Sequence, residues 1–128
     1  MENFSDLLTM AKSQPDAQRL LMVFVAIDGN ESNENPQGGY LTPIMCVDKT
    51  PDEIVSFESL LAESDNTGQK WDLVFVGALS GKGSIAPSNT DANKPLDAMI
   101  AKINMGMVSD YLAFNKQGEI LEMTPNSQ

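Results

Sequence analysis

The sequence predicts an α+β fold, in which about five mostly antiparallel strands form a two-layer arrangement with about three helices. Two observations predict it. Two long apolar runs, 20–27 and 71–79, are rich in branched and aromatic residues, as buried strands are. Other segments carry apolar residues at helical spacing on one face only. No repeat or linker divides the 128 residues, so we expect a single globular domain spanning 1–128.

Two of the helices are predicted from their apolar stripes. Residues 3–13 carry one stripe and end before Pro15, which stops a helix. The other helix opens at Pro95, after a loop over 80–94 that is rich in Gly, Ser, Pro, Asn and Asp. The apolar positions are Phe4, Leu7, Leu8 and Ala11 in the former, and Leu96, Met99, Ile100, Ile103 and Met107 in the latter.

The remaining helix has the clearest start signal in the chain. Thr50 is a preferred N-cap residue, Pro51 suits the first helical position, and Glu53 completes a capping box. We therefore expect one helix from residue 51 to the turn at 66–68. Its apolar stripe comprises Ile54, Phe57 and Leu61, with Leu60 beside it.

The strands complete the order helix, strand, strand, helix, strand, helix, strand, strand. The two long apolar runs should be central, because they suit burial on both faces. A strand over 40–47 contains Pro43, which indicates an edge position or a bulge. Segments 111–114 and 119–123 predict a hairpin with Gly118 in its turn. If the helices lie on one face of the sheet, the other face of the central strands still needs cover. The N-terminal helix or a second copy of the chain, in a homodimer, could supply it.

The composition excludes several kinds of catalysis. The chain has no histidine and a single cysteine, Cys46. Catalytic triads and Cys–His pairs need histidine, and zinc sites need several Cys or His ligands. We therefore predict no metal, no cofactor and no enzymatic activity. We expect Cys46 to pack in the core as a small apolar residue.

The net charge of −10 comes from 18 acidic and 8 basic residues. Such a surface repels phosphates and anionic lipids, so we expect neither nucleic acid nor membrane as a partner. It favours a basic protein partner, although acidity also serves solubility alone. No apolar run is long enough for a membrane helix and no basic signal segment opens the chain, so we predict a cytoplasmic protein.

One candidate site is a glycine-rich segment, which lies within the 77–94 region. A phosphate loop needs four residues between its first Gly and Gly-Lys, then Ser or Thr directly after Lys and a helix. Here the spacing is three, and a glycine separates the lysine from the serine. The weaker interpretation is an anion site built from backbone amides and one lysine. The candidate ligand-binding residues are Gly81, Lys82, Gly83 and Ser84.

A second candidate site is the acid-rich stretch 48–65. Acids in the first helical turn complement the helix dipole, which accounts for Asp52 and Glu53. The acids further along form either a docking face for a cationic partner or a solvated helix face. Calcium binding by the acidic loop after Asp28 is disfavoured, because its ligand spacing does not match an EF-hand. The candidate partner-binding residues are Glu58, Glu63 and Asp65.

Four segments carry a resemblance to known proteins: Phe4-Ser-Asp-Leu-Leu, Gln18-Arg-Leu-Leu-Met-Val-Phe, Met45-Cys-Val-Asp-Lys-Thr-Pro and Trp71-Asp-Leu-Val-Phe-Val. Through them the chain resembles a group of small bacterial proteins often labelled "ribonucleotide reductase subunit alpha". A reductase large subunit resembles a long barrel enzyme with several redox cysteines, whereas this chain has 128 residues and one cysteine. The resemblance therefore implies a bacterial, cytoplasmic, single-domain protein and carries over no catalytic residue.

Together these observations predict a non-enzymatic, acidic protein-interaction module, similar in profile to a small inhibitor or immunity protein. The alternative is a small binder of anionic ligands that uses the glycine-rich 77–94 loop. An enzyme that works through carboxylates is a third class, but sequence alone places no acid pair in a pocket.

Overall fold

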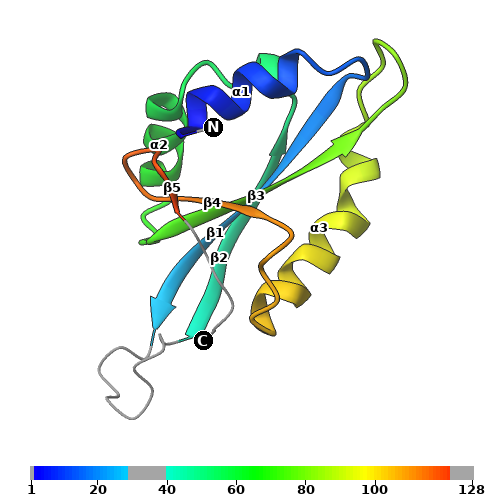
Figure 1. Cartoon of the computed structure of the whole chain (residues 1–128). Helices are drawn as coiled ribbons and strands as arrows, with labels where there is room; N and C mark the ends of the chain where they lie inside the picture. The colour runs from blue at the N-terminus through cyan, green and yellow to red at the C-terminus, as the bar shows by residue number, and fades with distance from the viewer. Residues whose placement is uncertain (1, 29–39, 122–128) are drawn as a thin grey trace.

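The computed structural model describes residues 2–28 and 40–121, and its elements follow the predicted order (Figure 1). The polar loop 29–39, which includes most of the acidic segment considered for calcium, lies outside the described residues. The helices are α1 (Phe4–Lys12), α2 (Phe57–Asn66) and α3 (Asn89–Asn104), with a 3₁₀ turn, η1 (Pro51–Glu53), ahead of α2. The strands are β1 (Gln18–Asp28), β2 (Tyr40–Lys49), β3 (Leu73–Ser80), β4 (Leu112–Phe114) and β5 (Ile120–Leu121).

The strands form one antiparallel sheet in the order β2-β1-β3-β4-β5. The two long apolar runs are neighbours in its middle, as predicted, and Leu21 pairs with Asp48 of β2 on one side and Gly77 of β3 on the other. The strand that contains Pro43 lies at the edge. Its register against β1 shifts between Phe24 and Val25, so this strand also carries the bulge that a proline indicates.

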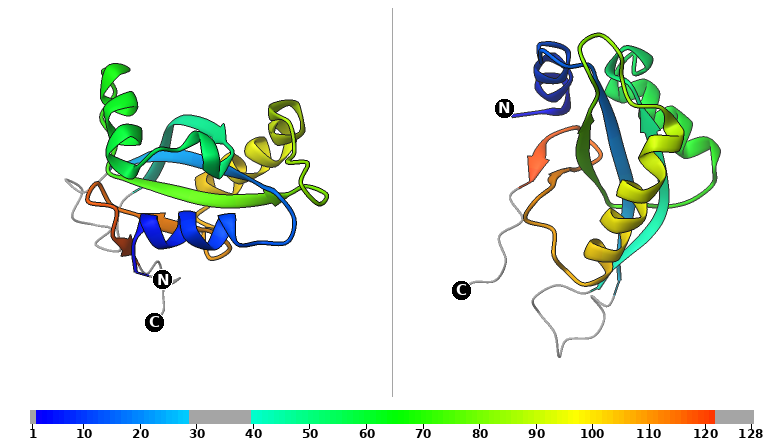
Figure 2. Two further views of the ribbon diagram at one scale, coloured as in Figure 1. Left: turned by 90° about the horizontal axis from the view of Figure 1, so that it is seen from above. Right: turned by 90° about the vertical axis from the view of Figure 1, so that its right-hand side faces the viewer.

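The helices cover both faces of the sheet, so the central strands are buried on both sides by the chain itself. Alternate residues of β1 and β3 face α1 and α2 on one side and α3 on the other. Figures 1 and 2 show α1 and α3 on opposite sides of the strands. The helices thus add a third layer to the two that were expected, because strands that are apolar on both faces need cover on both. Neither central face requires a second copy of the chain.

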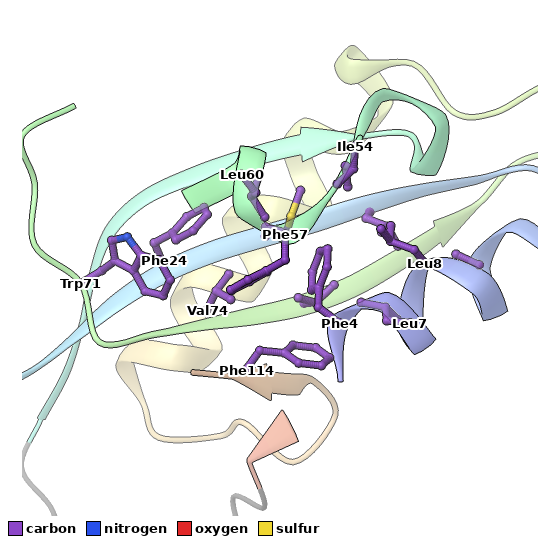
Figure 3. Packing of buried hydrophobic residues seen from close by; sticks show 14 residues of the cluster. Phe4, Leu7, Leu8, Phe24, Ile54, Phe57, Leu60, Trp71, Val74 and Phe114 are labelled. Atoms are coloured by element: carbon purple, nitrogen blue, oxygen red, sulfur yellow. The ribbon is translucent and has the colours of Figure 1, made fainter. Parts of the chain in front are cut away.

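Aromatic residues dominate the core under α1 and α2 (Figure 3). The Phe4 ring lies 5.1 Å from the Phe57 ring and 5.4 Å from the Phe114 ring, measured between centroids. At the other end of this core, Phe24 meets Trp71 edge-on at 4.9 Å. These separations suit favourable aromatic pairs, so the core joins both helices to the sheet.

The helix expected from residue 51 is divided in two. The Thr50 capping box opens a single 3₁₀ turn, after which Ile54 adopts an extended conformation. A second capping box, formed by Ser56 and Ser59, then starts α2. The division buries Ile54 and leaves Val55 85% exposed. The prediction of one continuous helix was wrong because the serine pair offers the backbone a new N-cap six residues after the first.

The start of α3 also differs from the prediction. This helix begins at Asn89 rather than at Pro95, with Ser88 and Asp91 forming its capping box. Pro95 lies inside the helix, where it cannot donate a hydrogen bond to the carbonyl of the preceding turn. The composition of residues 80–94 predicts a loop, but residues 89–94 are helical and Ala92 is fully buried against the sheet.

The β4–β5 hairpin closes one edge of the sheet. Its turn includes Gly118, whose φ of 80° is the left-handed conformation that favours glycine. The backbone N–H of Phe4 donates to Gly118 at 2.8 Å, and that of Ile120 donates to the Glu2 carbonyl at 3.1 Å. The first described residues therefore pair with the last strand. No helix in the described ranges is long and apolar enough to cross a membrane.

Candidate functional site

The glycine-rich segment folds as a tight turn at the end of β3. Lys82 and Ile85 exchange two backbone hydrogen bonds of 2.9 Å across Gly83 and Ser84. Gly83 has a φ of 56°, and a side chain on Gly81 would collide with the Ile85 carbonyl. The glycines are therefore needed to shape this hairpin turn.

The backbone N–H groups of Gly81, Lys82 and Gly83 are already bound within the chain. The Gly81 N–H donates to the Ala17 carbonyl at 2.8 Å, and the Gly83 N–H donates to Asp16 Oδ1 at 2.9 Å. The Asp16 carboxylate thus occupies a position that an anionic ligand would need. The structure keeps the four candidate residues together, but three of their four backbone N–H groups are bound within the chain, and the Lys82 side chain is exposed.

Two clefts flank this turn, and each has mixed charge. One, of about 380 Å³, lies against Lys82 and Asp91. The other, of about 280 Å³, separates the end of α1 from η1 and is bordered by Lys12 and Asp52. A carboxylate beside each lysine weakens attraction for an anion. The local geometry therefore gives the anion-binding alternative little support.

The three candidate partner-binding acids are exposed on α2, but they do not form one cluster. A helix turns about 100° per residue, so Glu58 and Asp65 share one flank and Glu63 lies on the other. Glu63 Oε1 lies 3.4 Å from Lys49 Nζ at the end of β2, and its side chain remains 57% exposed. The Glu63 flank is therefore the one that faces the edge strand.

The outer edge of β2 is open from Met45 to Lys49. In the described part of the chain, β2 pairs with β1 alone, and no other backbone group bonds to this segment. Alternate residues of an edge strand turn their N–H and C=O groups outward, where they are available to another strand. We refer to Met45–Lys49 as the open edge.

An apolar pocket of about 170 Å³ adjoins the open edge on the α2 side. Met45 and Val47 of β2 form one wall, and Phe24 and Leu60 belong to the aromatic core seen in Figure 3. The opposite wall is held by a buried hydrogen bond, in which Trp71 Nε1 donates to Ser64 Oγ at 3.0 Å. This contact fixes α2 against the sheet and keeps the pocket in shape. The lining residues are Phe24, Met45, Val47, Leu60, Glu63, Ser64 and Thr67.

The other face of the open edge carries carboxylates. Arg19 Nε lies 2.6 Å from Asp48 Oδ2 in a largely buried ion pair that joins β1 to β2. Cys46 lies on the same face and is exposed, so its predicted place in the core was wrong, because an edge strand has a neighbour on one side only. Partial burial raises the pKa of the Cys46 thiol, as do the nearby carboxylates of Asp48 and Asp97. Asp97 projects from α3, which packs along β2.

Sequence reasoning missed the open edge, its pocket and Asp97. Pro43 was the available signal, since it indicated an edge strand. No comparable signal connects Asp97 with β2, because the two are brought together only by the packing of α3. Among the described residues, no group of three or more Cys, Asp or Glu side chains is arranged to hold a metal ion.

Comparisons with known proteins add no family to this description: no family model, curated protein or solved structure matches the chain. The bacterial and cytoplasmic setting implied by the resemblance stays a prediction.

Proposed function

We propose that this chain is a non-enzymatic protein-interaction module that binds a basic protein through the open edge, while the exposed acids of α2 attract that partner at long range. One observation carries the proposal: the open edge, which has no strand partner among the described residues, lies beside an apolar pocket in a chain of net charge −10. Open edges are uncommon in folded proteins, because they invite pairing with other chains. Here Pro43 and the bulge interrupt one end of the edge, and the charged residues Asp48 and Lys49 lie at the other.

The charge distribution supports a cationic partner. The described residues contain three ion pairs, and two of them lie beside the open edge. Most of the 18 acids therefore have no ion-pair partner within the described ranges, and they attract a basic surface at long range. Apolar contact in the pocket would supply affinity, and the acids would supply steering and selectivity.

The alternative, an anion-binding loop, is less well supported. Three of its four backbone donors are bound within the chain, and each neighbouring cleft is lined by both a lysine and a carboxylate. A thermal-shift screen of nucleotides and phosphometabolites tests it. Stabilisation that is lost in Lys82→Ala would restore this alternative in place of protein binding.

Affinity purification from the organism that expresses the chain tests the main proposal. We expect a stoichiometric basic partner whose association slows as salt is raised, because salt screens steering. The double charge reversal Glu58→Lys with Asp65→Lys should slow association. Glu2→Lys with Asp110→Lys makes the same change in net charge at exposed positions outside α2 and the open edge, and serves as control. Recovery of no stoichiometric partner, or equal effects of both pairs, would count against the proposal.

A further inference from the structure

The open edge combines three features on one short segment. Its outward backbone groups have no partner in the described part of the chain. The α2 face of the segment borders an apolar pocket, and the α3 face borders Asp48 and Asp97. An extended peptide presents the matching features, since its backbone can pair along an edge and its side chains alternate between faces.

The pocket has the size of one apolar side chain. Its volume of about 170 Å³ is close to that of a cavity of ~150 Å³ that accepts a benzene-sized molecule. Met45 and Val47 belong to β2 itself, so a side chain in the pocket would project from a strand paired directly with them. The α2 wall limits how far such a side chain can extend.

The opposite face selects for positive charge. Asp48 is paired with Arg19, whereas Asp97 is exposed and forms no ion pair within the described ranges. Counting Glu63 and its partner Lys49, the groups around the open edge include three acids and two bases. A lysine or arginine on the α3 face of an added strand would therefore restore the charge balance there.

We infer that the partner binds by adding a β-strand to the open edge, with an apolar side chain in the α2-side pocket and a lysine or arginine facing Asp97. This inference rests on the proposed function and specifies its mode. The recognised segment is an extended stretch in which apolar and basic residues alternate. Pairing beyond Ile44 is hindered, because the bulge and Pro43 interrupt the edge there.

The probe is a panel of synthetic peptides of about seven residues, a common strand length, in which lysine alternates with Val, Leu, Ile or Phe. Titration into the isotopically labelled full chain, followed by NMR, should give saturable shifts. We expect them at the open edge and at Leu60–Thr67. Peptides of the same composition without alternation should bind at least about tenfold more weakly, since only alternation satisfies both faces.

Methylation of the peptide backbone tests strand addition directly. Methyl groups on one alternate set of peptide amides should abolish binding, because they remove the donors that face β2. Methyl groups on the other set should be tolerated. Equal effects of both sets would overturn the inference.

Two pairs of variants test the side-chain contacts. Val47→Trp fills the pocket and should weaken binding by about tenfold or more, as loss of an anchor does. Val55→Trp adds the same bulk at an exposed site away from the pocket and should leave binding unchanged. Asp97→Lys should weaken binding of the lysine peptides by about threefold, and Asp110→Lys should not.

The outcomes separate the two proposals. Partner binding that responds to charge reversal on α2 but not to Val47→Trp or to amide methylation would overturn strand addition and leave the proposed function standing. No saturable peptide binding would overturn strand addition. If light scattering showed a dimer that Val47→Trp converts to a monomer, a second copy would replace the basic peptide as the occupant of the open edge.

Discussion

The two edges of this sheet are treated differently. At the β5 edge, the first described residues of the chain lie alongside the final hairpin. Asn3 bridges Glu119, and Glu2 accepts a hydrogen bond from Ile120. At the β2 edge, the segment from Met45 to Lys49 has no such cover within the described ranges. A few main-chain contacts thus suffice to close the β5 edge, while the longer open edge of β2 has no partner among the described residues.

Closure of a sheet edge in this fold depends on how the covering segment is anchored as well as on strand pairing. Asn3 is the N-cap of α1, and Phe4, the first residue of that helix, is buried between Phe57 and Phe114. The covering segment is therefore held by a helix that packs on the same sheet. On the opposite side, α2 packs back from the edge and leaves a pocket.

Removing the anchor of the closed edge should have the largest effect. Phe4→Ala deletes a ring that is 1% exposed, and we expect the free energy of unfolding to fall by about 3–5 kcal/mol. Urea unfolding followed by the fluorescence of Trp71 measures it. Met10→Ala, on the exposed face of the same helix, should change stability by no more than about 0.5 kcal/mol. Similar losses in both variants would show that Phe4 is no special anchor.

A change in the wall of the pocket at the open edge should lower stability less than Phe4→Ala does. Ser64→Ala leaves the buried Trp71 Nε1 without its acceptor, which should lower stability by about 1–3 kcal/mol. Adding Trp71→Phe removes the unpaired donor, so the double variant should lose less than the sum of the single losses. Thr90→Ala, at an exposed hydroxyl, is the control. Strict additivity would contradict the hydrogen bond.

The exposed ion pair beside the open edge should contribute little to stability. Glu63→Gln removes the contact with Lys49, and we expect a loss of about 0.2–1 kcal/mol in low salt. In molar salt the difference should disappear, because solvent-exposed charges are screened. Denaturant unfolding at both salt concentrations measures it. A large loss that persists in high salt would mean that Glu63 has a packing role.

The thiol at the open edge offers the most sensitive local measurement. Because the pKa of Cys46 is raised in the fold, less thiolate exists at a given pH, and alkylation should be slower than in the unfolded chain. Asp97→Asn removes one of the nearby negative charges and should lower this pKa and speed alkylation. Asp52→Asn is the matched control. Unchanged kinetics in Asp97→Asn would show that Asp97 does not act on this face.

The sequence predicted the elements that depend on local chemistry. Residues 20–27 and 71–79 are apolar at nearly every position, and such runs are stable only between two covering layers. Pro43 signalled both the edge and the bulge, because it lacks an N–H to donate. Gly118 marked the hairpin turn, since its positive φ excludes most other residues.

The starts of α2 and α3 and the position of Asp97 were not predicted, because they depend on competition between local signals or on contacts distant in sequence. The Ser56–Ser59 pair competes with the Thr50 capping box, and composition does not show which start extends into a helix. Ser88 and Asp91 have the spacing of a capping box, but their polar neighbours resembled a loop. Only tertiary packing brings Asp97 close to Cys46 and separates Glu63 from Glu58.

The central pairing of β1 with β3 has a consequence for folding kinetics. Gln18 and Ser80, which are hydrogen-bonded at 2.9 Å across this pairing, are 62 positions apart in sequence. The β1–β2 and β4–β5 pairs join strands that are adjacent in the chain, whereas β1 meets β3 only after β2 and α2 have been passed. Closing so long a loop costs entropy before any of the central contacts repay it. We therefore expect refolding in stopped-flow experiments to be slower than that of helical bundles of equal size, and submillisecond refolding would contradict this view.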